Sequence, residues 1–349
     1  MKFFLPFVAF FMLFSCGTST YKGGLQVTGR VGEVLVVCDQ GIWDSPVKEV
    51  LDSHLTQFIM PYFPDVATFE LIHRTDKKFD GPIRRHRNIL FLRIDPKVKD
   101  GKGRMDKRKS VWADHQMVIE VVAKDYNQLL EVCDKGLRSA HNEFDYYEWY
   151  RIMKYFQESP KGKTAKRLKE YFGISLALPE GAVLVSGRKN FCRIELPVSS
   201  RPIEFVGSGT QDAGAIMSGI MVYQYKYTGA QDFDPKVLLQ ARDTMLKYNV
   251  PHEIPGLYMG TQYNELVYPE SSKTTNFSGT IKGVEMRGMF MFTGRDIHST
   301  GGAFWSFHFL HPKTQKVVCI SGYVDAPSTT SWTHPLREVE AIWKSVEIE

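Results

Sequence analysis

The chain has 349 residues, of which 43 % are hydrophobic and 24 % are charged, as in an ordinary globular protein that buries a core. This composition excludes collagen-like, coiled-coil and wholly disordered chains. The 44 Lys and Arg residues exceed the 39 Asp and Glu residues by only five charges, which is too few for a dedicated nucleic-acid binder. We therefore expect no nucleic acid among the partners, and the length favours two domains.

The first residues read as an export signal. Lys2 precedes twelve apolar residues that run from Phe3 to Phe14. A helix of that length is about 18 Å long, well short of the roughly 30 Å of a hydrocarbon core. Residues 1–15 are therefore predicted to be a signal peptide rather than a membrane span.

Leu13-Phe14-Ser15-Cys16 resembles the lipobox of bacterial lipoproteins, in which a small residue precedes an obligatory cysteine. The resemblance implies acyl chains of the palmitate type on Cys16 and a lipidated tether over 16–30. Several chains together make release from a membrane negligible. Gly17 stands where an Asp would imply inner-membrane retention, so we expect the outer membrane, on its periplasmic face. A plain secretory signal with an incidental cysteine remains the alternative.

Four further cysteines are far apart in the sequence and form no Cys-x-x-Cys pair, which argues against a zinc knuckle or a thioredoxin motif. We predict buried free thiols rather than disulfides at Cys38, Cys133, Cys192 and Cys319.

Residues 31–158 are predicted to form an N-terminal α/β domain. An apolar run at 33–38 predicts a buried strand, and helical spacing of apolar residues predicts a helix at 46–58. Short β-branched or aromatic runs bounded by Pro, Gly or Asp predict strands at 68–73, 88–94 and 116–122, and a long helix follows at 125–156.

Residues 159–180 are predicted to be a linker with a short basic helix at 164–172, followed by a C-terminal α+β domain over 181–349. The expected strands lie at 183–186, 191–196, 203–206, 219–227, 256–262, 275–281, 284–293, 303–310 and 316–324, and the helices at 235–248 and 335–345. The fold class is thus α+β, with mixed or antiparallel sheets packed by helices. Both halves run strand, helix, strands, helix, which suits either two similar α/β-sandwich halves or a coincidence of common units.

A strongly basic stretch lies between the strands at 88–94 and 116–122. Two interpretations stay open: a solvated flexible loop, or a patch that attracts anionic lipid headgroups or an acidic partner. Its cations are Lys97, Lys99, Lys102, Arg104, Lys107, Arg108 and Lys109.

Common catalytic signatures are absent from the sequence, including the Gly-x-Ser-x-Gly elbow, the His-Glu-x-x-His helix and the Walker loop. His308 and His311 are an odd number of residues apart, so they face opposite sides of their predicted strand and do not form a metal site. We expect no metal and no cofactor.

Gly301 and Gly302 follow two hydroxyl residues and precede Trp305. Backbone amides in such a turn can form an anion-binding nest, with Arg287 and Asp243 as candidate partners. The alternative is a tight turn that leads into a core strand.

Several short motifs, in this order and spacing, resemble a family of lipoproteins from Bacteroidetes-type bacteria that is classed only as a domain of unknown function. The resemblance covers nearly the whole mature chain and implies a lipid anchor and an envelope location, but no activity. The motifs are GEVLVVCD at 32–39, RDTML at 242–246, IPGLYMGT at 254–261, EMRGMF at 285–290, GGAFW at 301–305, GYVDAP at 322–327 and LREVEAI at 336–342.

We therefore expect a lipoprotein that serves as a non-enzymatic accessory or scaffold subunit of a protein complex in the cell envelope. One alternative is an enzyme that processes envelope glycan or peptide. Another is a lipoprotein that binds a soluble ligand near the Gly301-Gly302 turn.

Overall fold

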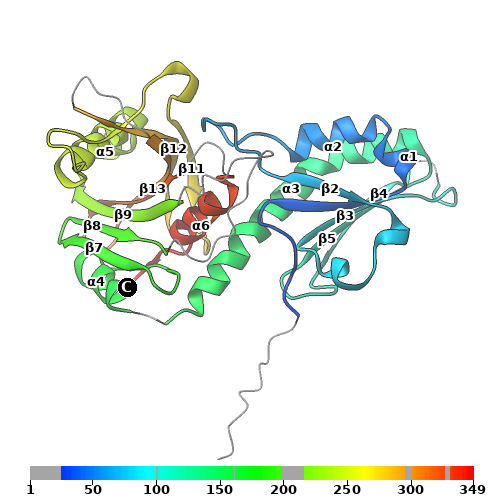
Figure 1. The fold of residues 1–349 in the computed structure, drawn as a ribbon, viewed down its shortest axis with the longest axis horizontal. Helices are drawn as coiled ribbons and strands as arrows, with labels where there is room; N and C mark the ends of the chain where they lie inside the picture. Colours follow the sequence, from blue (N-terminus) through cyan, green and yellow to red (C-terminus); the bar gives the residue numbers. More distant parts are fainter. Residues whose placement is uncertain (1–24, 100, 161, 198–215, 295–300, 327–330) are drawn as a thin grey trace, which may run out of the picture.

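The computed structural model describes residues 25–99, 101–160, 162–197, 216–294, 301–326 and 331–349. They form two lobes joined along the long helix α3 (Tyr126–Gln157), as Figure 1 shows. The predicted α+β class, with sheets packed by helices, is confirmed. The signal peptide, Cys16 and the predicted strand at 203–206 lie outside the described residues. Within the described part, no helix is long and apolar enough to cross a membrane.

The N-terminal lobe is built on a five-stranded sheet in the order β2 (Glu70–Arg74), β1 (Glu33–Val37), β3 (Asn88–Ile94), β5 (Met117–Ala123) and β4 (Arg104–Lys109). The first four strands are parallel, and β4 pairs antiparallel to β5 at the edge. The parallel strands are covered on both faces, which explains why β1 is apolar throughout after Glu33.

Helices cover one face of this sheet. After the short helix α1 (Gln40–Trp43), α2 (Val47–Leu55) packs with the first half of α3 over β1, β3 and β5. The other face is covered by two 3₁₀ turns, η1 (Asp76–Lys78) and η2 (Gly81–Arg85), together with Trp112.

The C-terminal lobe contains an eight-stranded antiparallel sheet. Its order is β10 (Tyr258–Thr261), β12 (Lys282–Thr293), β13 (Gly301–Leu310), β14 (Lys316–Asp325), β9 (Met217–Lys226), β8 (Phe191–Glu195) and β7 (Val183–Arg188), and β11 (Glu270–Thr275) pairs with β12. Smaller elements are α4 (Lys163–Phe172), the pair β6 (Ile174–Ser175) and β15 (Glu347–Ile348), η3 (Ala230–Phe233) and η4 (Glu265–Val267).

Two helices cover opposite faces of this sheet. On one face, α6 (Thr333–Lys344) places Trp343 against Phe307 and Trp305. On the other face, α5 (Pro235–Asn249) contributes to a cluster that includes Phe304. Because successive side chains of β13 alternate between the faces, Trp305, Phe307 and Phe309 pack under α6, while Ser306 and His308 lie on the same face as Phe304, under α5.

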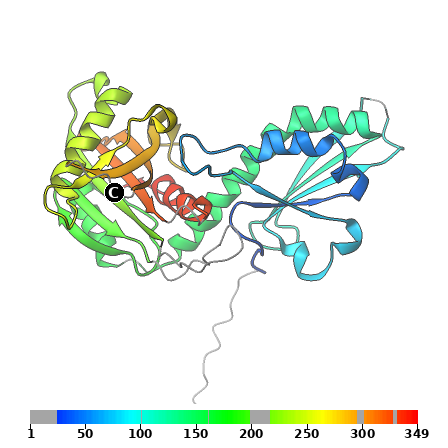
Figure 2. The same ribbon diagram turned by 45° about the horizontal axis from the view of Figure 1, so that its top comes forward.

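The two lobes share a core. The second half of α3 packs on α6, and Figures 1 and 2 both show α3 running from one lobe to the other. The loop after α2 inserts Tyr62, which is 3 % exposed, into the same core. Its hydroxyl donates a hydrogen bond to the backbone oxygen of Phe304 at 3.1 Å.

A buried ionic cluster fixes α3 to the N-terminal sheet. Glu148 of α3 is fully buried and forms ion pairs of 3.0 Å with both Arg87 and Arg151. Asn88, at the start of β3, also donates a hydrogen bond to it. Burial alone would raise the pKa of Glu148, but the two arginine charges hold that pKa below its ordinary value.

Two expected elements are wrong. Residues 104–109 form the edge strand β4 rather than part of a flexible loop, because they pair with the buried strand β5. The strand expected at 275–281 has already ended at Thr275, where β11 stops. A turn follows, closed by the Asn276 side chain, which accepts a hydrogen bond from the Ile281 backbone N–H at 3.0 Å.

The two sheets also differ in strand direction, which favours a coincidence of common units over a tandem repeat.

Candidate functional site

The residues expected to form a ligand site do not converge. Arg287 lies on the α6 face of β12, with its guanidinium 5.5 Å from the ring centre of Trp305. Asp243 lies on α5, beyond the other face, and accepts hydrogen bonds from the Tyr263 hydroxyl and the Thr261 backbone N–H. The sheet therefore separates Asp243 from Arg287.

Gly301 and Gly302 lie inside β13 rather than in a turn. They pair with Met291 and Phe290 of β12. A Cβ atom on Gly301 would lie 1.9 Å from the backbone oxygen of Phe290, and one on Gly302 would lie 2.0 Å from that of Val324. Close approach of neighbouring strands thus explains both glycines, which favours the alternative of a core strand over an anion-binding nest at this pair.

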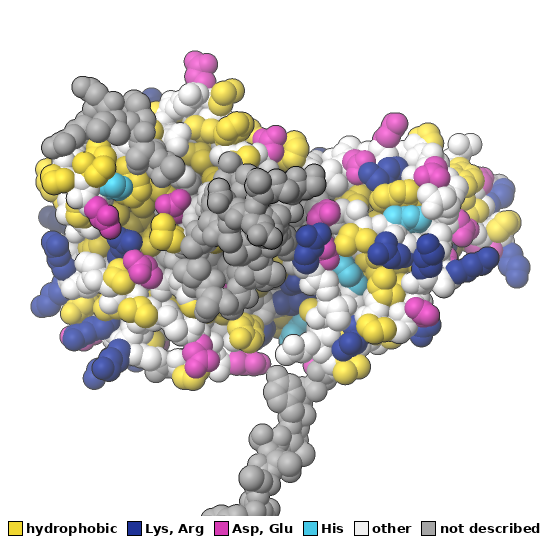
Figure 3. All heavy atoms as spheres, in the orientation of Figure 1, with side chains coloured by type: hydrophobic (Ala, Val, Ile, Leu, Met, Phe, Trp, Pro, Cys, Tyr) yellow, Lys and Arg dark blue, Asp and Glu magenta, His cyan; other side chains and the backbone are white. Residues whose placement is uncertain are grey.

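The basic stretch is largely neutralised along β4. Arg104, Lys107 and Arg108 form ion pairs of 2.8 to 3.0 Å with Asp106, Glu143 and Glu120. Lys109 lies 5.6 Å from the ring centre of Tyr147. Lys97, Lys99 and Lys102 are exposed, and cations gather at this outer end of the N-terminal lobe in Figure 3. Charged side chains on an edge strand also discourage pairing with other chains, which accounts for the pattern without a ligand.

A row of polar side chains lies on the sheet beneath α5. His308 of β13 and Cys319 of β14 are register partners, and both are fully buried. The His308 Nε2 atom is 3.0 Å from the Ser306 hydroxyl and 3.6 Å from the Cys319 sulfur.

His308 and Cys319 have the residue types of a nucleophile and its base, but burial gives them the wrong protonation states. It raises the pKa of Cys319 to about 12, and burial together with the Arg242 charge lowers the pKa of His308 to about 3. At neutral pH the thiol is therefore protonated, and it does not act as a thiolate nucleophile. As predicted, the four described cysteines Cys38, Cys133, Cys192 and Cys319 are buried and free.

Arg242 of α5 is inserted into this polar row. Its side chain is fully buried, and its guanidinium lies 3.7 Å from the ring centre of Phe304. Nη1 donates a hydrogen bond to the Ser321 hydroxyl at 2.7 Å, while Nε and Nη2 have no hydrogen-bond partner in the part of the chain that the structure describes. Burial lowers the pKa of this arginine, since a charge removed from water loses its hydration.

A cavity of about 720 Å³ adjoins the polar row between α5 and the strands β8 and β9. Tyr223 and Tyr225 line it, and the hydroxyls of both tyrosines are buried. The Tyr223 hydroxyl interacts with the Cys319 thiol, while that of Tyr225 has no hydrogen-bond partner among the described residues. The remaining lining residues are Arg188, Lys189, Asn190, Phe191, Gln224, Val237, Gln240, Ala241, Thr244, Met245, Tyr248 and Asn249.

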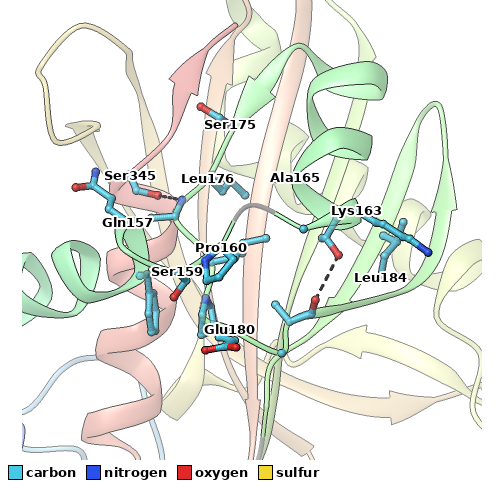
Figure 4. A pocket seen from close by; sticks show the side chains of 18 of the residues that line it. Gln157, Ser159, Pro160, Lys163, Ala165, Ser175, Leu176, Glu180, Leu184 and Ser345 are labelled. Atoms are coloured by element: carbon cyan, nitrogen blue, oxygen red, sulfur yellow. Dashed lines mark hydrogen bonds between the residues drawn. The ribbon is translucent and has the colours of Figure 1, made fainter. Parts of the chain in front are cut away.

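A second cavity, of about 750 Å³, lies between the end of α3, the start of α4 and residues 175–184, as Figure 4 shows. Polar groups around it already have partners. Ser345 accepts a hydrogen bond from the Ala177 backbone N–H, and Thr164 donates one to the Ala182 oxygen. None of its described lining residues has an unpartnered buried polar atom, so the cavity beneath α5 is the stronger candidate.

Residues 161–345 match the family described as Domain of unknown function (DUF4837). The chain belongs to the DUF4837 family. Residues 27–157 of this DUF4837 protein match a second description, Domain of unknown function (DUF8532). None of the curated proteins compared with it gives a match.

Two solved structures align with parts of this DUF4837 protein. The Ran-binding protein Mog1p of Saccharomyces cerevisiae is 14 % identical over 50 % of this chain and 90 % of its own, with a TM-score of 0.29. CyanoP, a cyanobacterial PsbP from Synechocystis sp., is 8 % identical over 55 % of this chain and 99 % of its own, with a TM-score of 0.26. Scores this low carry no conclusion about function.

Sequence reasoning missed the cavity of this DUF4837 protein, although one signal was present. Ser306 and His308 alternate with Trp305, Phe307 and Phe309 along β13. Such alternation in a strand that is buried on both faces indicates a polar layer beneath one covering element. The sequence did not indicate that Arg242 would enter that layer. No group of three or more potential metal ligands occurs among the described residues.

Proposed function

We propose that this chain is a lipoprotein anchored through Cys16 to the periplasmic face of the outer membrane, and that its C-terminal lobe binds a small ligand beneath α5. The lipobox-like Leu13–Cys16 segment supports the anchor. The observation that carries the binding function is the cavity beneath α5, whose lining combines aromatic and aliphatic side chains with amides and with the two cations Arg188 and Lys189.

The cavity volume falls within the range of about 300–1,000 Å³ that is typical of small-molecule sites. Phe191, Tyr223 and Tyr225 among its lining residues suit a ligand with a flat apolar body.

Filling the cavity tests this function. Ala241 lines the cavity from α5, so Ala241→Phe places a ring inside it. Lys236→Phe is the matched control, because Lys236 is exposed on the same helix and does not line the cavity. We expect the neutral dye N-phenyl-1-naphthylamine to bind the wild type and Lys236→Phe equally, and Ala241→Phe at least about tenfold more weakly. Equal binding of the dye to all three proteins would place it elsewhere and contradict the proposal.

The anchor is tested separately in cells. We expect the native protein in the membrane fraction, with an intact mass that includes acyl chains on Cys16, and Cys16→Ser in the soluble fraction. A native chain whose mass shows no acylation would refute the anchor but not the ligand site.

The accessory-subunit role is the second candidate, favoured by exposed apolar side chains on loops of both lobes. Phe63, on the loop after α2, is 69 % exposed, and Leu266 of η4 is 80 % exposed. Large exposed apolar groups often mark protein contacts. A stoichiometric partner that copurifies in mild detergent with the wild type, but not with Phe63→Asp or Leu266→Asp, would support this role. A lone acylated monomer would contradict it.

A further inference from the structure

The face that α5 turns to the sheet combines two apolar contacts with a charge. Leu238 and Leu239, in the first half of the helix, belong to one buried apolar cluster. Met245 and Leu246, in its second half, belong to another. Arg242 lies between these pairs along the helix and is fully buried. Apolar contacts therefore attach α5 on both sides of a buried charge.

Within the described residues, the charge of Arg242 has no acidic partner. The contacts that Arg242 does form, with the Ser321 hydroxyl and the face of Phe304, are with neutral groups. By contrast, the buried Arg151 of α3 pairs with Glu148. A charge that is removed from water without a counter-charge costs free energy, so Arg242 opposes the docking of α5 on the sheet.

The two long sides of α5 are held differently. One side is bound to the region of β10, where Asp243 accepts hydrogen bonds from the Tyr263 hydroxyl and the Thr261 backbone N–H. The other side, with Val237 and Ala241, borders the cavity and therefore lacks packing. The helix also lies on the side of the sheet that faces away from the N-terminal lobe (Figures 1 and 2). It is thus free to turn about its β10 side.

We propose that α5 is a cover that opens on its cavity side while the rest of the protein stays folded, and that a ligand in the cavity holds it closed. Opening returns Arg242 to water and uncovers the sheet beneath, including Cys319. A ligand that contacts both α5 and the strands β8 and β9 binds the closed position alone, so it lowers the open population. The effect of the ligand rests on the proposed binding function, whereas the opening of α5 does not.

Labelling of buried thiols in the full-length protein measures the opening. Cys319 packs with residues of α5, while Cys192 belongs to the cluster on the other face of the same sheet, and neither has any exposed surface. A covered thiol does not react, so its labelling rate reports how often its cover opens. With iodoacetamide and site-resolved mass spectrometry, we expect Cys319 to be labelled at least about tenfold faster than Cys192. Labelling of Cys319 that is no faster would overturn the proposal.

Arg242→Met tests whether the buried charge drives the opening. It should slow the labelling of Cys319 at least about tenfold and leave that of Cys192 unchanged, because the closed position no longer buries a charge. Arg74→Met is the control for net charge, since Arg74 is an exposed residue of β2, and it should change neither rate. Equal slowing at both thiols would show that the lobe opens as a whole, which would overturn the proposal.

Hydrogen exchange of the wild type decides the question if Arg242→Met proves unstable. We expect the backbone amides of α5 to exchange at least about tenfold faster than those of α6, which covers the opposite face of the same sheet. Equal protection of the two helices would contradict a separate opening of α5.

The dye N-phenyl-1-naphthylamine tests the effect of a ligand. At about one hundred times its dissociation constant it should slow the labelling of Cys319 at least about tenfold, and it should have no effect on Ala241→Phe. A dye that binds in the cavity without changing the rate would overturn the closing role of the ligand. A dye that does not bind would contradict the proposed function instead, and the labelling rates without dye would still decide whether α5 opens.

Discussion

Replacing Glu148 by alanine is expected to lower the free energy of unfolding by about 3–5 kcal/mol, because it leaves two buried guanidinium groups without a counter-charge. Arg87 and Arg151 both lie 3.0 Å from the Glu148 carboxylate, which is fully buried. The loss of the Asn88 hydrogen bond adds to the effect. Urea unfolding followed by tryptophan fluorescence measures the change.

The same helix offers a matched control. Glu131 of α3 forms an ion pair with Lys135, and both side chains are well exposed. Such pairs contribute little, so Glu131→Ala should change the free energy of unfolding by less than about 0.5 kcal/mol. Glu148→Gln keeps the shape and removes the charge, and it should lose most of what Glu148→Ala loses. Losses of similar size for Glu131→Ala and Glu148→Ala would contradict the view that burial makes this cluster important.

A second large effect is expected on lowering the pH, and His308 is its source. The pKa of His308 is about 3 in the folded chain, against an ordinary value near 6.5. Between these values the unfolded chain binds a proton that the folded chain does not. The free energy of unfolding therefore falls as the pH falls, by about 1.4 kcal/mol per pH unit from this group alone.

The contribution of His308 is obtained by measuring the free energy of unfolding against pH for the wild type and for His308→Gln. Glutamine does not titrate and can still hydrogen-bond to the Ser306 hydroxyl. Neighbours that face His308 are Cys319 of β14, Tyr223 of β9 and Arg242 of α5. Burial raises the pKa of Cys319 and of Tyr223, away from the range of pH 4.5 to 7, and an arginine keeps its proton in proteins. Between pH 7 and 4.5 the wild type should lose about 2.5 kcal/mol more than the variant. Equal losses would show that His308 gains its proton while folded.

The strands that consist of a continuous run of apolar residues could be predicted from the sequence. The strand predicted at 88–94 has the same bounds as β3. Its apolar residues lie between polar ones, and this local pattern predicts a buried strand without knowledge of distant parts of the chain. By contrast, β4 has the sequence RMDKRK, which carries no strand signal. It becomes a strand because β5 offers an unpaired edge, and this depends on the tertiary fold rather than on local preference.

The candidate site was harder to predict for a related reason. Asp243, Arg287 and the two glycines were grouped because they occur in recognisable motifs, and motifs do not show on which face of a sheet a residue lies. Helix α5 and strand β12 place Asp243 and Arg287 on opposite sides of the same sheet. The cavity itself exists only once α5 has docked, so no single segment of the sequence encodes it.

Helix α3 makes the two lobes interdependent in folding. Its first half completes the N-terminal core, while Trp149, Ile152 and Met153 of its second half belong to the core that α6 closes. A chain cut after α3 would present those side chains to water, and burying them is worth about 1.5–3 kcal/mol for each large apolar residue. During synthesis, the N-terminal region therefore keeps this apolar surface exposed until the last helix of the chain has been made.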